Sequence, residues 1–247
     1  MLISVIGASG MIGSQVVQIL TAAGHDVVGA SLRTGANVLT GEGLDDAVAG
    51  AAVLVDVTNS PQLDDDTATD FFTTSSANLV KAAASAGVEH YVALSIVGAD
   101  GITDSGYMRA KVIQERTIAE SGVPFTIVRA TQFHEFADAI VGSLAVGDEF
   151  HAPVARIQPI ASADVAAAVA DAAQRAPADG IVDVGGPEKM TFADMARAVL
   201  AHQGKDSTVV DDAAATYFGA RVDHDTLVTS AGARLGTQRF TDWLATQ

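Results

Sequence analysis

The chain has 247 residues, of which 49% are hydrophobic, and a formal net charge of −16. That length suffices for one large domain with a substantial core. A surface this acidic repels phosphate backbones and anionic lipid, so we expect neither nucleic acid nor a membrane as a partner. Cysteine is absent, which excludes disulfides, thiolate zinc sites and a cysteine nucleophile. The N-terminus has no signal-peptide pattern and no long apolar run follows it, so a cytoplasmic protein is expected.

Short β-rich runs alternate with helical stretches over the first half of the chain. Strands are predicted at 2–7, 26–31, 52–58, 89–95 and 124–130, with a weak one near Asn37–Leu39. Helices are predicted at about 11–23, 44–50, 67–86 and 106–121. Strands separated by helices form βαβ units with a parallel sheet, and ligands of such sheets bind at the carboxyl ends of the strands.

The alternation is looser after residue 131. A strand is predicted at 180–186, and helices at 162–176 with Ser162 as N-cap, 191–204, near 213–218 and about 233–245. We therefore predict an α/β fold, a single Rossmann-type domain over 1–247 with a doubly wound parallel sheet. Its cofactor-binding core is residues 1–131, and a small C-terminal substrate lobe is made of 132–160 and 187–247.

A glycine loop follows the first strand and opens the first helix. GASGMIG supplies Gly7, Gly10 and Gly13, which permit a tight turn, a close backbone approach to a diphosphate, and close packing of helix on strand. The free N–H groups at the helix start favour an anion there. The loop residues predicted to bind the cofactor are Gly7, Ser9, Gly10, Met11, Ile12 and Gly13. A nucleophile elbow at Ser9 is excluded because Met11 stands where that motif needs glycine.

The end of the second strand indicates which dinucleotide binds. An acidic residue there would bind the ribose 2′-hydroxyl of NAD. The chain has none and instead offers Ser31 and Arg33, and an arginine fork suits a 2′-phosphate. We therefore expect NADP(H) in preference to NAD(H). In the alternative reading Arg33 is a solvated loop residue.

A tyrosine stands four residues before a lysine in SGYMRAKVIQE. On a helix, Tyr107 and Lys111 share a face. In one reading Lys111 pairs with Glu115 and the tyrosine ring only packs. In the other, the pair is chemical, because a lysine ammonium lowers the pKa of a neighbouring phenol. Ser95 ends the fifth predicted strand and should emerge at the ligand edge.

The glycine loop, the strand-end Ser95 and the Tyr-x-x-x-Lys pair together resemble the short-chain dehydrogenase/reductase superfamily. The G-x-x-G-x-x-G spacing, AGVEHYVALSIVG and SGVPFTIVRATQF are similar to its atypical, NmrA-like group. The resemblance covers most of the chain and is strongest over 1–133. It implies NADPH-dependent reduction of a small carbonyl compound, or the reverse oxidation of an alcohol. Tyr107 would be the acid/base, Ser95 would bind the carbonyl oxygen, and Lys111 would also hold the nicotinamide ribose.

The chain departs from the superfamily at one catalytic position. Many relatives carry an asparagine in the long helix before the serine strand, where this chain has Phe72. Asn59, at the end of the fourth predicted strand, is expected to line the cofactor cleft instead. Thr131 after the sixth strand is expected to contact the cofactor. The expected substrate residues are Gln132, Phe133 and His134. His134 is either a second acid or a partly exposed polar residue.

Two alternatives to a carbonyl reductase stay open. Atypical members include NADP-binding redox sensors that regulate partners without turnover, and a quinone or alkene reductase would need no tyrosine acid. The expected partner is a small carbonyl or quinone substrate, with a homo-oligomer possible by resemblance. The acidic run 64–70 is interpreted as a helix start, because carboxylates favour that end of a helix dipole, rather than as a metal site.

Overall fold

The computed structural model describes residues 1–247 and confirms an α/β fold built on a parallel sheet. Its seven strands lie in the order β12-β9-β5-β4-β3-β1-β2. They are β1 Leu2–Ile6, β2 Asp26–Ala30, β3 Val53–Asp56, β4 His90–Ile96, β5 Phe125–Ala130, β9 Gly180–Gly185 and β12 Arg234–Leu235. In this order β1 lies between β3 and β2. The glycine loop that follows β1 therefore lies beside the end of β3.

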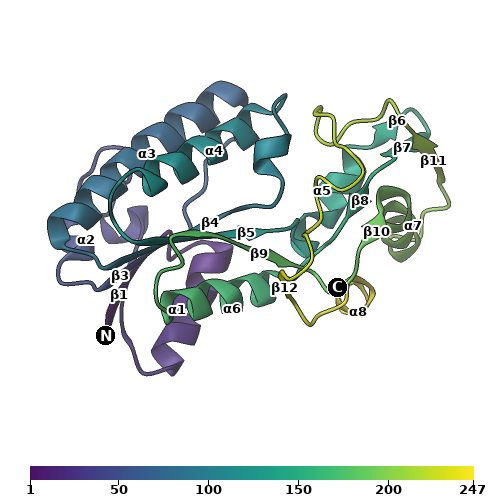
Figure 1. The fold of residues 1–247 in the computed structure, drawn as a ribbon. Helices are drawn as coiled ribbons and strands as arrows, with labels where there is room; N and C mark the ends of the chain where they lie inside the picture. Colours follow the sequence, from purple (N-terminus) through teal and green to yellow (C-terminus); the bar gives the residue numbers. More distant parts are fainter. The chain divides into compact units, whose positions relative to one another are not determined.

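Helices cover both faces of the sheet, as expected for a doubly wound fold (Figure 1). The helices are α1 Met11–Ala22, α2 Leu44–Val48, α3 Asp65–Ala86, α4 Gly106–Ala119 and α6 Ser162–Ala173. Figure 1 shows α3 and α4 on one face and α1 and α6 on the other. A buried cluster that includes Ile6, Leu54, Leu79, Tyr91 and Ile118 joins the sheet to α3 and α4. Burial of this cluster is the main force that holds these elements together.

Local signals explain where the helices start and stop. Asp64 caps α3 by accepting a 3.0 Å hydrogen bond from the Thr67 N–H, so the acidic run is a helix start as interpreted. Gly24 ends α1 with a φ of +84°, the left-handed conformation expected of a C-terminal glycine. Ser162 is the first residue of α6 rather than its cap, and its hydroxyl donates to the Glu135 carboxylate.

The chain divides into two compact units, which we describe separately. The first contains residues 1–95, 106–129 and 165–182, and the second contains 96–105, 130–164 and 183–247. The second unit holds α5 Ala137–Gly142, α7 Phe192–His202 and α8 Phe240–Leu244. The proposed organisation as one domain with a 1–131 core stays a prediction.

The second unit also holds two small sheets that the sequence pattern does not predict. One has the order β11-β7-β6, with β7 Glu149–Pro153 parallel to β11 Thr208–Asp212 and antiparallel to β6 Ala145–Val146. The other pairs β8 Arg156–Ile157 with β10 Met190–Thr191. These strands are short or partly exposed, so they lack the apolar runs that mark β1 and β3.

Three predicted elements are wrong. Asn37–Leu39 is a turn, because the Asn37 side chain accepts the Leu39 N–H at 2.9 Å. No helix forms at 213–218, where Phe218 and Gly219 both have positive φ and turn the chain between Tyr217 and Ala220. The last helix covers only Phe240–Leu244, and residues Arg234–Leu235 form β12 instead.

Candidate functional site

The glycine loop between β1 and α1 has the backbone geometry that its sequence predicts. Gly7 has a φ of +88°, which side chains disfavour. A Cβ at Gly13 would lie 2.2 Å from the Gly7 carbonyl oxygen, so only glycine permits this approach of helix and loop. A Cβ at Gly7 would lie 2.9 Å from the carbonyl oxygen of Val57, just after β3. The loop is thus packed against the carboxyl end of β3.

The start of α1 fits a phosphate group. Ser9, Gly10 and Met11 are exposed, whereas Ile12 and Gly13 are buried. No side chain caps the helix at Gly10 and its first turn holds no acidic residue. The first-turn N–H groups therefore have no partner inside the helix, and the positive end of the helix dipole favours an anion. These residues fit the diphosphate of a dinucleotide.

The segment after β2 contains no carboxylate, as the sequence predicts. Ser31 precedes a short 3-10 helix at Leu32–Thr34, and its N–H donates to the Thr34 hydroxyl at 2.9 Å. Arg33 is exposed on this short helix. An exposed guanidinium here can accept a 2′-phosphate, and this geometry is compatible with both NAD and NADP.

Tyr107 lies in the first turn of α4, with its hydroxyl directed to the end of β3. That hydroxyl donates a 2.7 Å hydrogen bond to Asn59 Oδ1. Asn59 is exposed and follows Val57, the residue that packs on Gly7. The tyrosine ring meets the Phe72 ring edge-on, with centroids 6.0 Å apart. The phenol therefore lies at the strand edge that also carries the glycine loop.

Lys111 does not pair with Glu115, although one interpretation of the sequence expects that pair. Its Nζ donates to the Leu94 carbonyl at 2.9 Å and to the side-chain oxygen of Gln114, and lies 4.4 Å from the Phe72 ring centroid. Glu115 is paired with Arg129 instead. Burial lowers the pKa of Lys111 to about 8, although the charges of Asp56 and Glu115 oppose this. The lysine is thus held at the end of β4.

The expectation that Lys111 lowers the pKa of Tyr107 is wrong for this structure. Burial raises the pKa of Tyr107 to about 12. The Lys111 ammonium is bonded to the Leu94 carbonyl and the Gln114 side chain instead of the phenol. Tyr107 is therefore a neutral phenol at physiological pH.

Ser95 is the next-to-last residue of β4 and is only 3% exposed. Its Oγ has no hydrogen-bond partner. A buried hydroxyl without a partner is energetically costly. A bound ligand that forms a hydrogen bond with the Ser95 hydroxyl would remove this cost. Lys111 binds the carbonyl of the preceding residue, which connects the lysine to this strand end. The role of Ser95 stays a prediction.

The segment after β5, in the second unit, is more deeply buried than expected. Thr131 Oγ1 and the Gln132 amide are buried and have no hydrogen-bond partner, and the His134 ring is buried near the Pro159 backbone. Phe133 stacks on Phe136 with centroids 5.5 Å apart. Thr131 and Gln132 thus have buried polar atoms without partners, and the contacts of Thr131, Gln132, Phe133 and His134 with cofactor or substrate stay predictions.

His134 is fully buried, so the interpretation of His134 as a partly exposed polar residue is wrong. It has no exposed surface and packs against Phe240 and Trp243, with ring centroids 5.3 and 5.4 Å away. Burial lowers its pKa, so the ring is neutral at physiological pH. A neutral, enclosed imidazole is a poor proton donor, which weakens the reading of His134 as a second acid.

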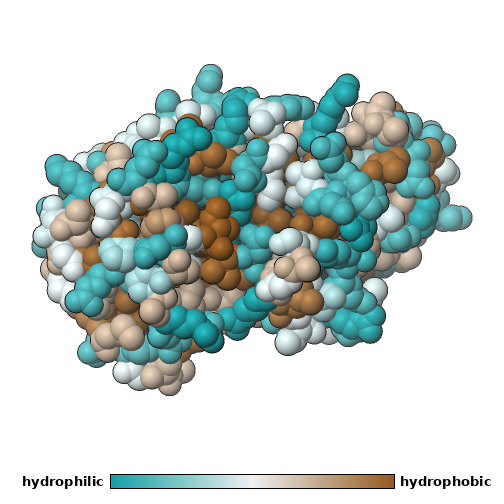
Figure 2. Space-filling model, viewed as in Figure 1, coloured by the Kyte–Doolittle hydropathy of each residue, from teal (hydrophilic) through white to brown (hydrophobic).

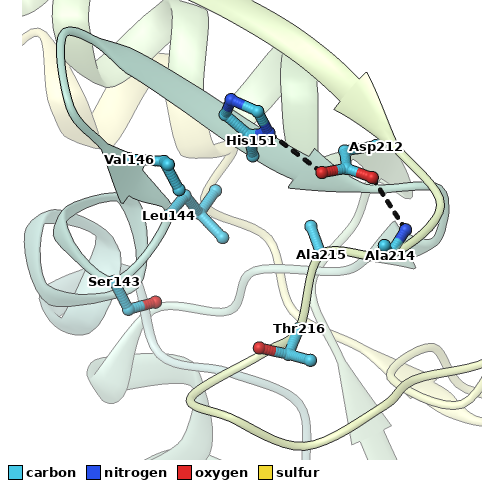
Figure 3. A pocket seen from close by; sticks show the side chains of 8 residues that line it. All are labelled: Ser143, Leu144, Val146, His151, Asp212, Ala214, Ala215 and Thr216. Atoms are coloured by element: carbon cyan, nitrogen blue, oxygen red, sulfur yellow. Dashed lines mark hydrogen bonds and ion pairs between the residues drawn. The ribbon is translucent and has the colours of Figure 1, made fainter.

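A separate pocket of about 380 Å³ lies within the second unit (Figure 3). Its lining residues are Ser143, Leu144, Val146, His151, Asp212, Ala214, Ala215 and Thr216. His151 and Asp212 are joined at 2.9 Å, and Asp212 also accepts the Ala214 N–H at 2.8 Å. The hydrogen bond to Asp212 raises the pKa of His151. In Figure 3 this pair ties β7 to β11 at one side of the pocket.

Two residues near Lys111 were not identified from the sequence. Asp56 ends β3 inside an apolar run and is 1% exposed, and Gln114 on α4 is equally buried. The Gln114 amide joins the Asp56 carboxylate to Lys111. A charged residue inside a buried strand was the only available signal, since a charge is rarely buried without a partner.

Comparison with known families assigns the cofactor class. The model of a family described as NAD(P)H-binding matches residues 7–176. That span contains the glycine loop, Ser95, Tyr107 and Lys111. No curated protein matches the chain.

Solved structures with the same fold cover nearly all of the chain. One is the enzyme WbmH of Bordetella bronchiseptica with NAD+, at 15% identity and a TM-score of 0.72, covering 99% of this chain and 95% of that one. Another is MoeE5 with UDP-glucuronic acid and NAD, at 18% identity and a TM-score of 0.74, covering 100% and 97%. The dTDP-4-dehydrorhamnose reductase of Bacillus anthracis with NADP has 14% identity and a TM-score of 0.67, covering 86% and 85%.

These likenesses confirm the Rossmann-type fold, and the family match confirms an NAD(P)H-binding chain. The solved structures contain NAD or NADP, so they do not select one dinucleotide. No helix has both the length and the apolar character needed to cross a membrane.

Proposed function

The chain belongs to the NAD(P)H-binding family, and we propose that it is an oxidoreductase that uses NADPH to reduce a small carbonyl compound. The carrying observation is the 2.7 Å hydrogen bond between the Tyr107 hydroxyl and Asn59. This bond brings a phenol to the carboxyl end of β3, beside the glycine loop. Ligands of parallel sheets bind at that edge.

The chain's own residues supply the proton and the orientation. When bound, the cofactor supplies the hydride. Tyr107 donates the proton to the substrate oxygen, and the Ser95 hydroxyl, which has no other partner, donates a hydrogen bond to the same oxygen. Before substrate binds, Asn59 Oδ1 accepts the phenol hydrogen. Because the hydroxyl has a single hydrogen, it turns from Asn59 to the substrate oxygen for the transfer, and the phenolate then takes up a proton from solvent. Many members of the superfamily that the chain resembles have a catalytic asparagine where this chain has Phe72. In this chain, Asn59 is the asparagine that lies next to the phenol.

The protonation of Tyr107 favours reduction over oxidation at neutral pH. A pKa of about 12 keeps the phenol protonated, which is the form that a reduction consumes. Alcohol oxidation needs the phenolate, whose fraction grows about tenfold per pH unit below the pKa. We expect the oxidative rate to rise with pH while the reductive rate stays flat near neutrality.

The first test replaces Tyr107 by phenylalanine. We expect NADPH-dependent turnover of a ketone, aldehyde and quinone panel to fall roughly 100- to 10,000-fold, because the proton donor is lost. NADPH affinity, measured by cofactor fluorescence, should stay within about twofold, since the phenol does not contact the phosphates in this proposal.

The control for this test is Thr117→Val, which removes a hydroxyl from the same helix, where it donates to the Ile113 carbonyl. It should leave turnover unchanged. Equal turnover by wild type and Tyr107→Phe on carbonyl substrates would contradict the assignment of Tyr107. Retained reduction of quinones alone, with carbonyl reduction lost, would instead favour a quinone or alkene reductase whose proton comes from solvent.

A preference for NADPH over NADH is the finer part of the proposal. It rests on the exposed Arg33 after β2 and on the missing carboxylate there. Arg33→Ala should weaken NADPH binding by about ten- to a hundredfold through loss of a charged hydrogen bond. NADH binding should change little.

The control for this experiment is Arg116→Ala, since Arg116 is exposed near the end of α4. Titration of both cofactors into the three proteins gives the comparison. If the two cofactors lose affinity equally in Arg33→Ala, the residue does not read the 2′-phosphate.

A redox sensor is the second candidate, and the orientation of Lys111 favours it. The ammonium is held by Leu94 and Gln114 and leaves the pKa of Tyr107 high. A pair that is not tuned for proton transfer fits a protein that binds NADP(H) without turnover. Tight NADPH binding without turnover on any compound, together with partner binding that depends on the NADP/NADPH ratio, would establish this function.

A further inference from the structure

A network of buried polar groups joins β3, α4 and β4 around Lys111. Asp56 Oδ2 accepts hydrogen bonds from the Tyr91 hydroxyl at 3.0 Å and from Gln114 Nε2 at 2.8 Å. The other side of the Gln114 amide accepts from Lys111 Nζ, which also donates to the Leu94 carbonyl at 2.9 Å. Every one of these side chains is at least nine-tenths buried.

The two charges fix the orientation of the amide between them. Its NH₂ group faces the Asp56 carboxylate and its oxygen faces the Lys111 ammonium. The flipped amide would place a carbonyl against the carboxylate and NH₂ against the ammonium, and both contacts are repulsive in a buried site. Gln114 therefore has one orientation, and the position of Asp56 determines it.

Asp56 is itself rigidly held. Its Oδ1 accepts from the Thr58 N–H at 3.0 Å and from the Thr58 hydroxyl at 2.7 Å. With Tyr91 on its other oxygen, the carboxylate is anchored to β3 and β4 independently of α4. The carboxylate can thus act as a fixed reference point for a side chain on the helix.

We propose that Gln114, oriented by Asp56, is a positioning residue that holds the Lys111 ammonium at the end of β4, next to Ser95. This inference rests on the proposed function, in which Lys111 and Ser95 belong to the site. The amide links the charge of Lys111 to that of Asp56 without a direct ion pair. The fixed ammonium in turn binds the Leu94 carbonyl and so steadies the strand end that carries Ser95.

The groups that act on Lys111 are few. They are the carboxylates of Asp56 on β3 and Glu115 on α4, the Gln114 amide, the Leu94 carbonyl and the ring of Phe72 on α3. Glu115 is already bound by Arg129. Replacing Gln114 therefore changes one contact of the ammonium and leaves the others in place.

The test measures the pKa of Lys111 by NMR of isotope-labelled lysine side chains, with the signal assigned from Lys111→Met. Gln114→Leu removes the acceptor and should lower the pKa by about one unit. Gln114→Glu keeps an oxygen beside the ammonium, so the pKa should not fall, whether the new carboxyl is ionised or shares a proton with Asp56. Thr117→Val is the control, because it removes a polar group from the same helix whose hydroxyl donates to the Ile113 carbonyl and not to this network, and it should leave the pKa unchanged.

A pKa that falls in Gln114→Leu and does not fall in Gln114→Glu supports the proposal, and a general loss of stability does not produce that difference. If Gln114→Leu does not fold, Gln114→Met takes its place in the comparison. A pKa of Lys111 that stays the same in the apolar variant, or that falls equally in both variants, overturns the proposal. The measurement needs no substrate, so a wild type without turnover would refute the proposed function while leaving this result intact.

Discussion

Arg129→Met should cost about 3–5 kcal/mol in the free energy of unfolding. Arg129 on β5 and Glu115 on α4 form two parallel hydrogen bonds of 2.8 and 2.6 Å, with side chains only 10% and 8% exposed. Methionine keeps much of the volume but removes the guanidinium. The Glu115 carboxylate would then be buried without its partner, which is the costly outcome for a buried pair.

Urea denaturation of the variant measures this cost directly. Arg175→Met is the matched control, because Arg175 pairs with Asp171 on the surface with 72% and 36% exposure, and such pairs contribute about 0–1 kcal/mol. The double variant Glu115→Gln, Arg129→Met should recover part of the loss, since it removes the unpaired charge. Equal effects of the two single methionine variants would show that burial of the Arg129 pair carries no special energy.

Gly13→Ala should abolish detectable NAD(P)H binding and lower stability by about 1–3 kcal/mol. The new Cβ would lie 2.2 Å from the Gly7 carbonyl oxygen and 2.9 Å from the Ala8 Cα. Both neighbours are backbone atoms that a side-chain rotation cannot move. The start of α1 must therefore shift away from the loop, which disturbs the N–H groups predicted to bind the diphosphate.

Gly142→Ala provides the control for this substitution. Gly142 ends α5 in the second unit, and a Cβ there would meet nothing within 4 Å. Its stability should change by no more than about 1 kcal/mol, with NAD(P)H affinity kept. Fluorescence titration and thermal unfolding of both variants make the comparison. Undiminished NADPH binding by Gly13→Ala would show that the cofactor does not depend on the glycine loop.

The sequence determines the core of the fold because its signals there are local. Buried strands such as β1 and β3 are continuous apolar runs, and the loop after β1 needs glycine at Gly7 and Gly13 for steric reasons. Both patterns can be recognised without knowing what the residues touch. The family match over 7–176 agrees with this part of the chain.

The second unit was harder to predict because its strands are short and partly exposed. β6, β8, β10 and β12 have two residues each, too few for an alternating pattern. The alanine-rich segment before Tyr217 looks helical by composition. Asp212 and the turn at Phe218 and Gly219 hold it in another conformation. Tertiary contacts override propensity in such segments.

For the candidate site, the sequence by itself determined which residues share a helix face and which end a strand, and hence that Tyr107, Lys111 and Ser95 belong to neighbouring elements. Only the tertiary structure decided where the lysine ammonium lies. Helix spacing places Lys111 on the side of Tyr107, but a long flexible side chain goes where its charge is best satisfied. That place is set by Asp56, Gln114 and Leu94, whose approach depends on how β3, β4 and α4 pack, and no local pattern encodes that packing.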